Sequence, residues 1–204
     1  MSSRKYSSAR RAETAAATRA NILQTALALF KERGYAGTGM SDVASGAGVA
    51  VQTIYSSVGN KPQLLIALLQ DAATDEMIAA SMSTVSTATE SLDVLTAIGH
   101  GGRLVLERHD WLLGALYDNA AADPVIATML AAEVDEFYRR LETAATQLLA
   151  LGGVRDDLTR DDVTTILWFH FGFEPWRTLR KAGWSWNRAE PWLLEQAAHV
   201  LLRS

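Results

Sequence analysis

The chain has 204 residues, of which 49% are apolar and 21% are charged, and it contains no cysteine. This composition predicts a folded, soluble protein and excludes disulfides, thiolate nucleophiles and cysteine-based zinc or iron–sulfur sites. No apolar run approaches the roughly 20 residues of a membrane span, and the N-terminus is polar where a signal peptide would be apolar. We therefore expect a cytoplasmic protein.

The net charge of −4 conceals a contrast between the two ends of the chain. Residues 1–61 carry eight basic and three acidic side chains, whereas residues 62–204 carry eleven basic and twenty acidic ones. This contrast favours a polyanionic partner for the N-terminal segment. The alternative is that the first basic residues form only a solvated tail, or a disordered arm that adds non-specific attraction. These residues are Arg4, Lys5, Arg10 and Arg11.

The spacing of apolar residues predicts helices in nearly every stretch of the chain. Residues 22–30 form one apolar stripe, and Gly34 follows as a stop signal. Two short helices are expected next, over residues 40–47 and 51–57, with Gly48 between them. Helices of this length do not stand alone in water, so they must pack on their neighbours.

Capping signals and breaks divide the rest of the chain into six more helices. The expected segments are a helix opened by Asn60 and Gln63, a Ser/Thr-rich break at 81–89, helices at about 92–109 and 111–119, a long helix opened by Asp123 and Pro124 and ended by Gly152, a helix at about 160–181 opened by Thr159 and Asp162, and a last helix at about 188–203 opened by Asn187 and Glu190. Pro175 is expected to kink the helix at 160–181, because proline removes a backbone donor and crowds the carbonyl of Phe171. With no alternating strand pattern, the predicted fold is all-α with about nine helices.

Two short helices joined through a glycine, inside a basic three-helix unit, are the layout of a helix-turn-helix. Residues 18–65 also resemble the tetracycline-repressor (TetR) family. The matching residues are Thr18-Arg19, Ile22-Leu23, Ala26, Leu29-Phe30, Gly34-Tyr35, Thr38, Met40, Asp42-Val43-Ala44, Ala47-Gly48-Val49, Thr53-Ile54-Tyr55, Lys61 and Leu64-Leu65. The resemblance implies a DNA-binding domain over residues 1–61 and a helical ligand-binding and dimerisation domain over residues 62–204.

The second short helix is expected to enter the major groove of DNA. Val51 and Gln52 begin it and should face base edges, where valine can pack on a thymine methyl and glutamine can pair with adenine. The alternative for Val51 is a place in the core. We expect core roles for four apolar residues with the right spacing: Val43, Ala44, Val49 and Ile54.

Five further residues match positions that contact DNA in the family. Thr53, Tyr55 and Lys61 correspond to phosphate contacts, a task that hydroxyl and ammonium donors suit. Met40 and Ser41 correspond to positions that often touch DNA. The alternatives are that Tyr55 is a core aromatic and that Thr53 is only a hydroxyl on the helix surface.

The sequence also departs from the family pattern at three positions. The family commonly has Ser or Thr at the positions of Gly39 and Ala50, and often Phe at Val58. The missing hydroxyls remove side-chain caps from both short helices, each worth about 1 kcal/mol, with Gly the milder loss. We expect these departures to affect DNA affinity rather than the fold.

For the C-terminal part, the resemblance implies a small-molecule effector and a homodimer. The segment from Trp168 to Trp192 resembles the last two helices of many family members, which pack against the partner subunit, in keeping with aromatic enrichment at interfaces. Candidate effector contacts are Arg103, Trp111, Tyr117, Phe137, Trp168 and Phe171. The alternative for each aromatic residue is a core position. His170 and Glu174 are expected either to anchor a ligand or to form an interhelical pair.

No pattern in the sequence indicates an enzyme, a metal or a cofactor. The four histidines lack i,i+4 spacing, and the glycine-rich piece nearest to a dinucleotide-binding motif, Gly46-Ala47-Gly48, follows no strand. We therefore expect a homodimeric repressor that binds a pseudo-palindromic operator and is released by a small molecule. The alternative is a helical adaptor that binds protein through its aromatic face, although it leaves the basic segment unexplained.

Overall fold

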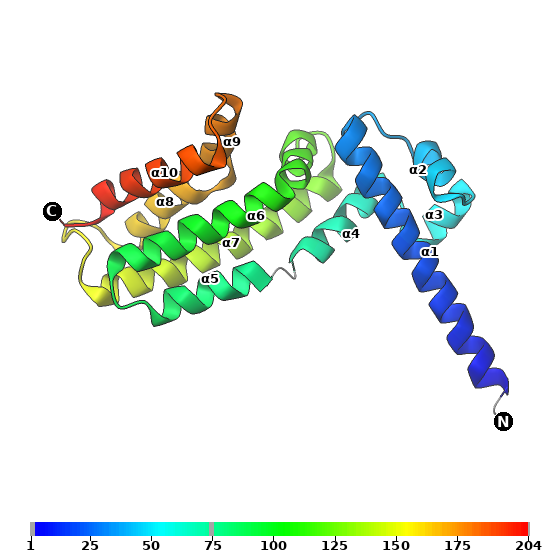
Figure 1. The fold of residues 1–204 in the computed structure, drawn as a ribbon, viewed down its shortest axis with the longest axis horizontal. Coiled ribbons are helices and arrows are strands. Elements are labelled where there is room, and N and C mark those ends of the chain that lie inside the picture. The colour runs from blue at the N-terminus through cyan, green and yellow to red at the C-terminus, as the bar shows by residue number, and fades with distance from the viewer. Residues whose placement is uncertain (1–2, 74–75, 204) are drawn as a thin grey trace. The chain divides into compact units, whose positions relative to one another are not determined.

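The computed structural model describes the backbone of residues 3–73 and 76–203 and the side chains of residues 10–69 and 76–203. The described residues form ten helices and no strand longer than an isolated bridge (Figure 1). The helices are α1 (Ser3–Arg33), α2 (Met40–Ala47), α3 (Val51–Ser57), α4 (Lys61–Ala73), α5 (Glu76–Thr87), α6 (Ser91–Asn119), α7 (Pro124–Leu151), α8 (Arg160–Phe171), α9 (Phe173–Lys181) and α10 (Trp186–Leu201). The all-α prediction is confirmed.

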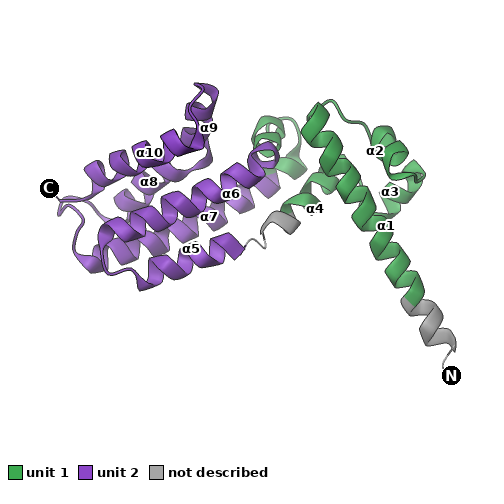
Figure 2. Ribbon diagram, viewed as in Figure 1, with its two compact units in different colours: residues 1–74, 114–127 green, residues 75–113, 128–204 purple. Residues whose placement is uncertain are grey.

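The chain forms two compact units (Figure 2). The first unit contains residues 1–74 together with 114–127, and the second contains residues 75–113 together with 128–204. The first unit thus includes the turn between α6 and α7 as well as α1 to α4. The functional division at residues 61 and 62 stays a prediction, because compact packing does not say which residues serve DNA or a ligand.

The first unit is built around the apolar stripe of α1. Ile22, Ala26 and Phe30 are buried there, and Val43 of α2 and Ile54 of α3 are buried as well. The predicted bounds of α2 and α3 are confirmed. Gly48 between them has φ +66°, a left-handed conformation that side chains other than glycine rarely adopt. The Asn60–Gln63 capping box is also present, with both backbone-to-side-chain bonds formed.

Helix α1 begins much earlier than the apolar stripe, at Ser3. The expectation of a disordered basic arm is therefore wrong, because the backbone is helical through Arg10 and Arg11. The sequence between residues 9 and 17 contains five alanines, and alanine has the highest helix propensity of all residues. The helix extends beyond its buried stripe for this local reason.

The Ser/Thr-rich segment at 81–89 is mostly helical, so the predicted break is wrong up to Thr87. Hydroxyl groups compete with helical hydrogen bonds only when they find other partners. Here Thr84 and Thr87 donate to carbonyl oxygens of the preceding turn, those of Ala80 and Ser83. The buried Val85 fixes the helix on its neighbours.

Residues 91–119 form one helix rather than the predicted two. The sequence around Asp110 contains no proline or glycine to end a helix, and Leu106, Leu112 and Leu116 continue one buried stripe across the expected gap. The long helix α7 begins as predicted, since the Asp123 carboxylate accepts hydrogen bonds from the backbone of Val125 and Ile126.

The predicted helix at 160–181 is two helices, α8 and α9. Gly172 between them is extended (φ −64°, ψ 172°). Pro175 does not kink a continuous helix, because it lies in the first turn of α9, where the missing backbone donor has no helical acceptor anyway. The last helix starts earlier than predicted, with the Ser185 hydroxyl rather than Asn187 as its cap.

The second unit packs α10 closely against α6 and α8. Gly99 of α6 lies where a β-carbon would stand 2.8 Å from a methyl of Leu194 and 3.0 Å from the ring of Phe171. The C-terminal end is fixed by the bridge between Val154 and Leu202 and by a hydrogen bond from Arg203 to the Val154 carbonyl. No helix within residues 3–73 and 76–203 is long and apolar enough to span a bilayer.

Candidate nucleic-acid interface

Side chains of α1 hold the C-terminal ends of both short helices. The Arg19 guanidinium donates to the Ser57 carbonyl oxygen at 3.0 Å, and the Asn21 amide donates to the Ala47 carbonyl oxygen at 2.9 Å. The last carbonyls of a helix have no partner within the helix, and a cation there also complements the helix dipole. Both residues therefore position the two short helices, α2 and α3, on α1.

The N-terminus of α2 lacks a side-chain cap, as the glycine at position 39 predicts. The Asp42 carboxylate instead accepts a hydrogen bond from the Gly39 backbone at 2.7 Å. This bond fixes the first turn of α2, where Met40 is half-buried and Ser41 is exposed. Ser41 therefore presents its hydroxyl to solvent at the start of the helix.

Helix α3 presents one face to solvent and one to the core. Ile54 is fully buried, whereas Val51 is 37% exposed and Gln52 is also exposed. The alternative of a core position for Val51 is therefore wrong. Tyr55 is 49% exposed, so the core alternative for this aromatic is wrong as well. A helix face with free amide, hydroxyl and methyl groups has the chemistry that reads base edges and phosphates.

The first turn of α3 is held by backbone hydrogen bonds rather than by a side-chain cap. Ala50 gives no side-chain cap, and the first bond of the helix runs from the Thr53 backbone to the Ala50 carbonyl oxygen at 2.8 Å. Thr53 itself is half-buried, and its carbonyl oxygen accepts a bond from the Ser56 hydroxyl. The predicted loss of caps at Gly39 and Ala50 is thus present in the structure.

Lys61 opens α4 and leans over an aromatic ring. Its ammonium lies 4.3 Å from the centre of the Tyr35 ring and donates to the Ala36 carbonyl oxygen at 3.4 Å. Burial lowers the pKa of Lys61, while burial and the nearby Asp123 carboxylate raise the pKa of Tyr35 to about 12. An ammonium has three donors, so these contacts leave Lys61 able to reach a phosphate.

Three residues matter to this geometry without having been assigned a role from the sequence. Arg19 and Asn21 bind the C-terminal ends of α3 and α2. The only sequence feature that could have indicated this role is their polar character within the part of α1 that packs on these helices. Gly46 is the third, since a β-carbon there would stand 2.7 Å from the Thr25 methyl on α1. Thr38, in the family pattern, is 2% exposed and donates to the Leu29 and Gly34 carbonyl oxygens.

The structure brings together only some of the candidate effector contacts. Phe137 and Trp168 form a ring pair with centroids 5.8 Å apart, and Tyr138 adds a second ring at 6.1 Å from Trp168. The Arg140 guanidinium lies 5.6 Å from the centre of the Phe137 ring. Phe137 and Trp168 are therefore the two candidates that contact each other, and with Tyr138 they form what we call the α7–α8 aromatic cluster.

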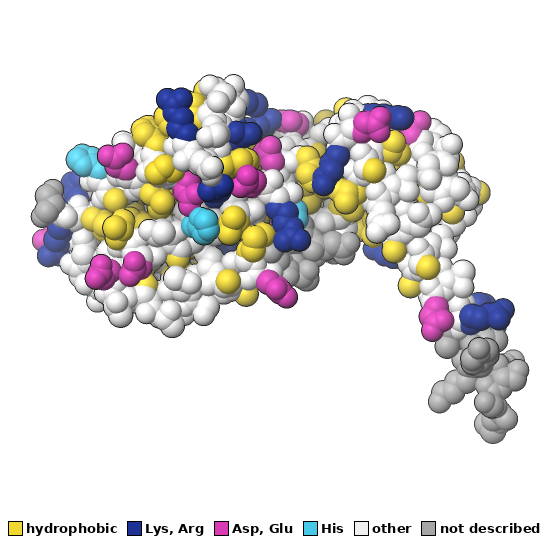
Figure 3. All heavy atoms as spheres, in the orientation of Figure 1, with side chains coloured by type: hydrophobic (Ala, Val, Ile, Leu, Met, Phe, Trp, Pro, Cys, Tyr) yellow, Lys and Arg dark blue, Asp and Glu magenta, His cyan; other side chains and the backbone are white. Residues whose placement is uncertain are grey.

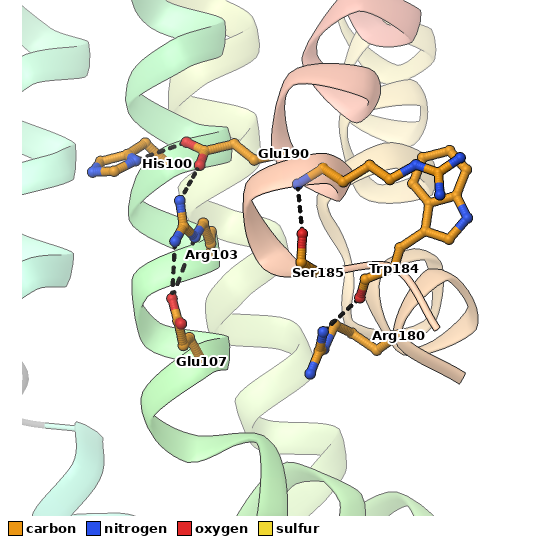
Figure 4. Close-up of polar contacts among 8 residues, drawn as sticks. His100, Arg103, Glu107, Arg180, Trp184, Ser185 and Glu190 are labelled. Atoms are coloured by element: carbon orange, nitrogen blue, oxygen red, sulfur yellow. Dashed lines mark hydrogen bonds and ion pairs between the residues drawn. The ribbon is translucent and has the colours of Figure 1, made fainter. Parts of the chain in front are cut away.

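Arg103 lies in a charged network between α6 and α10 (Figure 4). Its guanidinium donates to Glu190 at 2.7 Å and also pairs with Glu107 at 3.2 Å, while His100 contacts the other Glu190 oxygen at 2.7 Å. Burial alone would raise the pKa of Glu190, but the bonds from Arg103 and His100 outweigh it and hold that pKa below its usual value. Arg103 thus has a partner within the second unit.

The other candidates lie in different surroundings. Phe171 is buried against Gly99, which is a core position. Trp111 is half-buried on α6, and Tyr117 belongs to the first unit. His170 contacts the Ile166 carbonyl of its own helix, and Glu174 pairs with Arg177 within α9, so the expected interhelical pair is absent from the described contacts of both.

Two tryptophans, Trp184 just before α10 and Trp186 at its start, stack with arginines. Arg188 lies 3.8 Å from the centre of the Trp184 ring, and Trp184 in turn meets Trp192 edge-on at 5.6 Å. Figure 4 shows Trp184 in the turn before α10 and Arg180, from the last turn of α9, donating to the Trp184 carbonyl. Trp192 is 41% exposed and Phe169 of α8 is 70% exposed, so large apolar groups face solvent on this bundle.

Comparison with known proteins supports this description. Residues 22–68 match the model of the bacterial regulatory proteins of the tetR family. No curated protein sequence matches the chain.

Solved structures with the same fold cover nearly the whole chain. A protein assigned as a transcriptional regulator from Saccharomonospora viridis, in complex with choline, is 19% identical, with a TM-score of 0.72 over 93% of this chain and 100% of that one. NalD of Pseudomonas aeruginosa, a secondary repressor of a multidrug efflux pump, is 20% identical, with a TM-score of 0.69 over 93% and 99%. The ketosteroid regulator KstR2 of Mycobacterium tuberculosis is 20% identical, with a TM-score of 0.63 over 91% and 95%.

The exposed face of α3 and the family match together describe residues 22–68 as a segment similar to the helix-turn-helix part of bacterial regulatory proteins. The matched segment includes α2, α3 and most of the apolar residues that pack them on α1. The match to the tetR family model covers residues 22–68, and the likeness to the solved structures over the rest of the chain is a likeness of fold.

Proposed function

We propose that the protein is a cytoplasmic, homodimeric repressor that binds a pseudo-palindromic operator and leaves it when a small molecule binds. The observation that carries the proposal is the solvent-facing side of α3, where Val51, Gln52 and Tyr55 are exposed while Ile54 anchors the helix. Two such helices about 34 to 36 Å apart would reach successive major grooves. The twofold symmetry of a dimer would require a symmetric operator.

The proposed DNA contacts divide by chemistry. Val51 and Gln52 contact base edges, and Met40 and Ser41 approach the DNA from the start of α2. Three donors hold phosphates: Thr53, Tyr55 and Lys61. The exposure of Ser41, Gln52 and Tyr55 supports these roles, whereas Thr53 and Lys61 are half-buried and would reach a phosphate with only their donor groups.

We place the effector at the α7–α8 aromatic cluster. Phe137, Tyr138 and Trp168 offer stacked ring faces, and Arg140 beside Phe137 offers a donor to an anionic or carbonyl group. Aromatic walls with few polar groups favour an apolar organic ligand. Arg103, Trp111, Tyr117 and Phe171 stay candidate contacts. Similar folds bind choline in one regulator and are associated with ketosteroids and drug efflux in others, so the effector class differs among neighbours.

We place the dimer interface on the last helices of the second unit. Phe169 and Trp192 are large apolar residues exposed on α8 and α10, and exposed aromatic groups of this size are typical of interface cores. Each subunit would bury its copy of the same surface, as a twofold interface requires.

The experiment that tests the proposal is a pull-down of genomic fragments with the purified protein at about 150 mM salt, followed by sequencing. Enrichment of a short inverted repeat is the expected result, because specific binding exceeds non-specific binding by about 10³-fold or more. Uniform recovery of fragments would contradict the repressor. In that case the alternative, a helical adaptor for another protein, would be the better description. A variant with Gln52→Ala and Tyr55→Ala should lose the enrichment while remaining folded and dimeric.

A further inference from the structure

The first turns of α1 are a helical extension without a core of their own. Every residue from 10 to 17 is exposed, and the buried stripe begins only at Ile22. Figure 1 shows α1 continuing past α2 and α3, and Figure 3 shows basic side chains at the described end of this part. We call Ser3–Ala17 the α1 extension. Helices without a packed face rarely persist for stability alone, so this one calls for a partner.

The composition of the α1 extension suits a phosphate backbone. It carries four basic residues, Arg4, Lys5, Arg10 and Arg11, against one acidic residue, Glu13. The rest consists of Ala, Ser, Thr and a single Tyr, so no apolar group calls for a protein partner or a lipid. Small side chains between the arginines let a helix approach a duplex closely.

The anchor of the α1 extension lies at the recognition helix. Arg19, two residues after the α1 extension, donates to the Ser57 carbonyl at the C-terminal end of α3. The α1 extension therefore begins beside the helix that is proposed to enter the groove. With a rise of 1.5 Å per residue, its fifteen residues span about 22 Å, the length of about six base pairs.

We propose that the α1 extension binds the phosphate backbone of the duplex that flanks each half-site, as a continuous helix with α1. This inference rests on the proposed function, because it needs the recognition helix in the groove. Arg10 and Arg11 are the contacts whose side chains the structure describes, and both are exposed. Contacts of this kind add affinity without base specificity, and each makes binding more dependent on salt.

The test uses the inverted repeat recovered by the pull-down in two duplexes, one ending at the repeat and one with about ten further base pairs on each side. Wild-type protein should bind the flanked duplex more tightly. The slope of log K against log salt should be steeper by about 0.9 for each added phosphate contact.

Three pairs of substitutions separate the contributions of the charge of the α1 extension, of its helical conformation and of positive charge elsewhere on α1. Arg10→Gln with Arg11→Gln removes two charges and keeps helix propensity. Lys31→Gln with Arg33→Gln removes the same charge from the other end of α1 and is the control. Ala15→Gly with Ala16→Gly keeps all charges but weakens the helix, because glycine has a much lower helix propensity than alanine. Circular dichroism and thermal unfolding check that the variants fold.

The expected result is that the arginine variant loses the gain from the flanks and binds the short duplex as wild type does, while the control variant keeps the gain. A wild-type protein that binds both duplexes equally would overturn the inference and leave the repressor intact. If the glycine variant keeps the whole gain, the helical part of the proposal is wrong. If neither duplex is bound specifically, the proposed function fails first, and the inference falls with it.

Discussion

Gly46 of α2 lies so close to Thr25 of α1 that a β-carbon would stand 2.7 Å from the threonine methyl. This distance is far below van der Waals contact, and the methyl is held on a short, branched side chain. The two helices therefore touch at this point through a glycine, and the position of α2 on α1 depends on it.

Gly46→Ala should destabilise the protein by up to about 2 kcal/mol, because overpacking of this kind costs about 1 to 3 kcal/mol and the gain in helix propensity offsets about 1. In a Thr25→Ser background, which lacks the methyl, the same change should stabilise the protein. Urea unfolding of the four variants measures both effects. Equal effects of Gly46→Ala in the two backgrounds would show that the contact does not limit the packing.

Gln52→Ala should weaken binding to the operator by about 1 to 3 kcal/mol, and most of the loss should arise at one base pair. The side chain is exposed at the start of α3, so stability should change little. Competition with every single-base variant of the operator checks the prediction. A loss spread evenly over all base substitutions would mean that Gln52 does not contact a base.

Lys61→Met should make the salt dependence of DNA binding shallower by about 0.9 per subunit, since one phosphate contact is lost. Methionine keeps the apolar stem over the Tyr35 ring, so the fold should survive. Burial lowers the pKa of Lys61, and wild-type affinity should therefore begin to fall at a lower pH than an exposed lysine would allow. An unchanged salt slope would show that Lys61 serves only the contact with Tyr35 and Ala36.

Glu190→Gln should reduce the free energy of unfolding at pH 7 by about 1 to 3 kcal/mol, because charge-assisted bonds to Arg103 and His100 are lost. The pKa of Glu190 is lowered in the folded protein, so its contribution is present above the usual carboxyl value of 4.5 and disappears as the pH falls through the folded value. The difference between wild type and variant should shrink in acid. The control is Glu174→Gln, which removes the exposed ion pair between Glu174 and Arg177 on α9. It should change stability by less than about 1 kcal/mol.

Arg19→Ala and Asn21→Ala should lower specific DNA affinity more than non-specific affinity, because both residues set the position of the short helices rather than the charge of the surface. Loss of an uncompensated helix-end contact should also cost about 1 kcal/mol of stability. Paired titrations with operator and random duplex give the ratio. Gln24→Ala, on an exposed position of α1, should leave the ratio unchanged.

The sequence was informative wherever one local signal decided the outcome. The stretch from Gly39 to Ser57 has short helices, a glycine turn and an alternating burial pattern, and the helix bounds predicted there are confirmed. The capping pairs at Asn60 and Asp123 are also present, since each needs only residues a few positions apart.

The errors arise where tertiary packing overrides local signals. The hydroxyl-rich segment up to Thr87 is helical because Val85 is buried against neighbouring helices and the hydroxyl groups donate to carbonyls of the preceding turn. Neither feature produces a recognisable pattern in the sequence. The sequence prediction also missed the break between α8 and α9 at Gly172, because Pro175 three residues later is a stronger helix-breaking signal and predicts a kink instead. In the site, exposure of Val51 and Tyr55 follows from where Ile54 is buried, whereas Arg19 and Asn21 act on carbonyls 26 or more positions away.

The two units exchange chain three times, after residues 74, 113 and 127, and two of these crossings fall inside continuous helices, α6 and α7. A single cut therefore cannot release the first unit intact. A fragment ending near residue 74 would lack residues 114–127, including the Asp123 carboxylate that acts on Tyr35. A chimera that exchanges the first unit between such regulators must therefore include residues 114–127, the turn between α6 and α7 with the adjoining helix ends, along with α1 to α4. Otherwise the transferred helices would pack against residues from another protein.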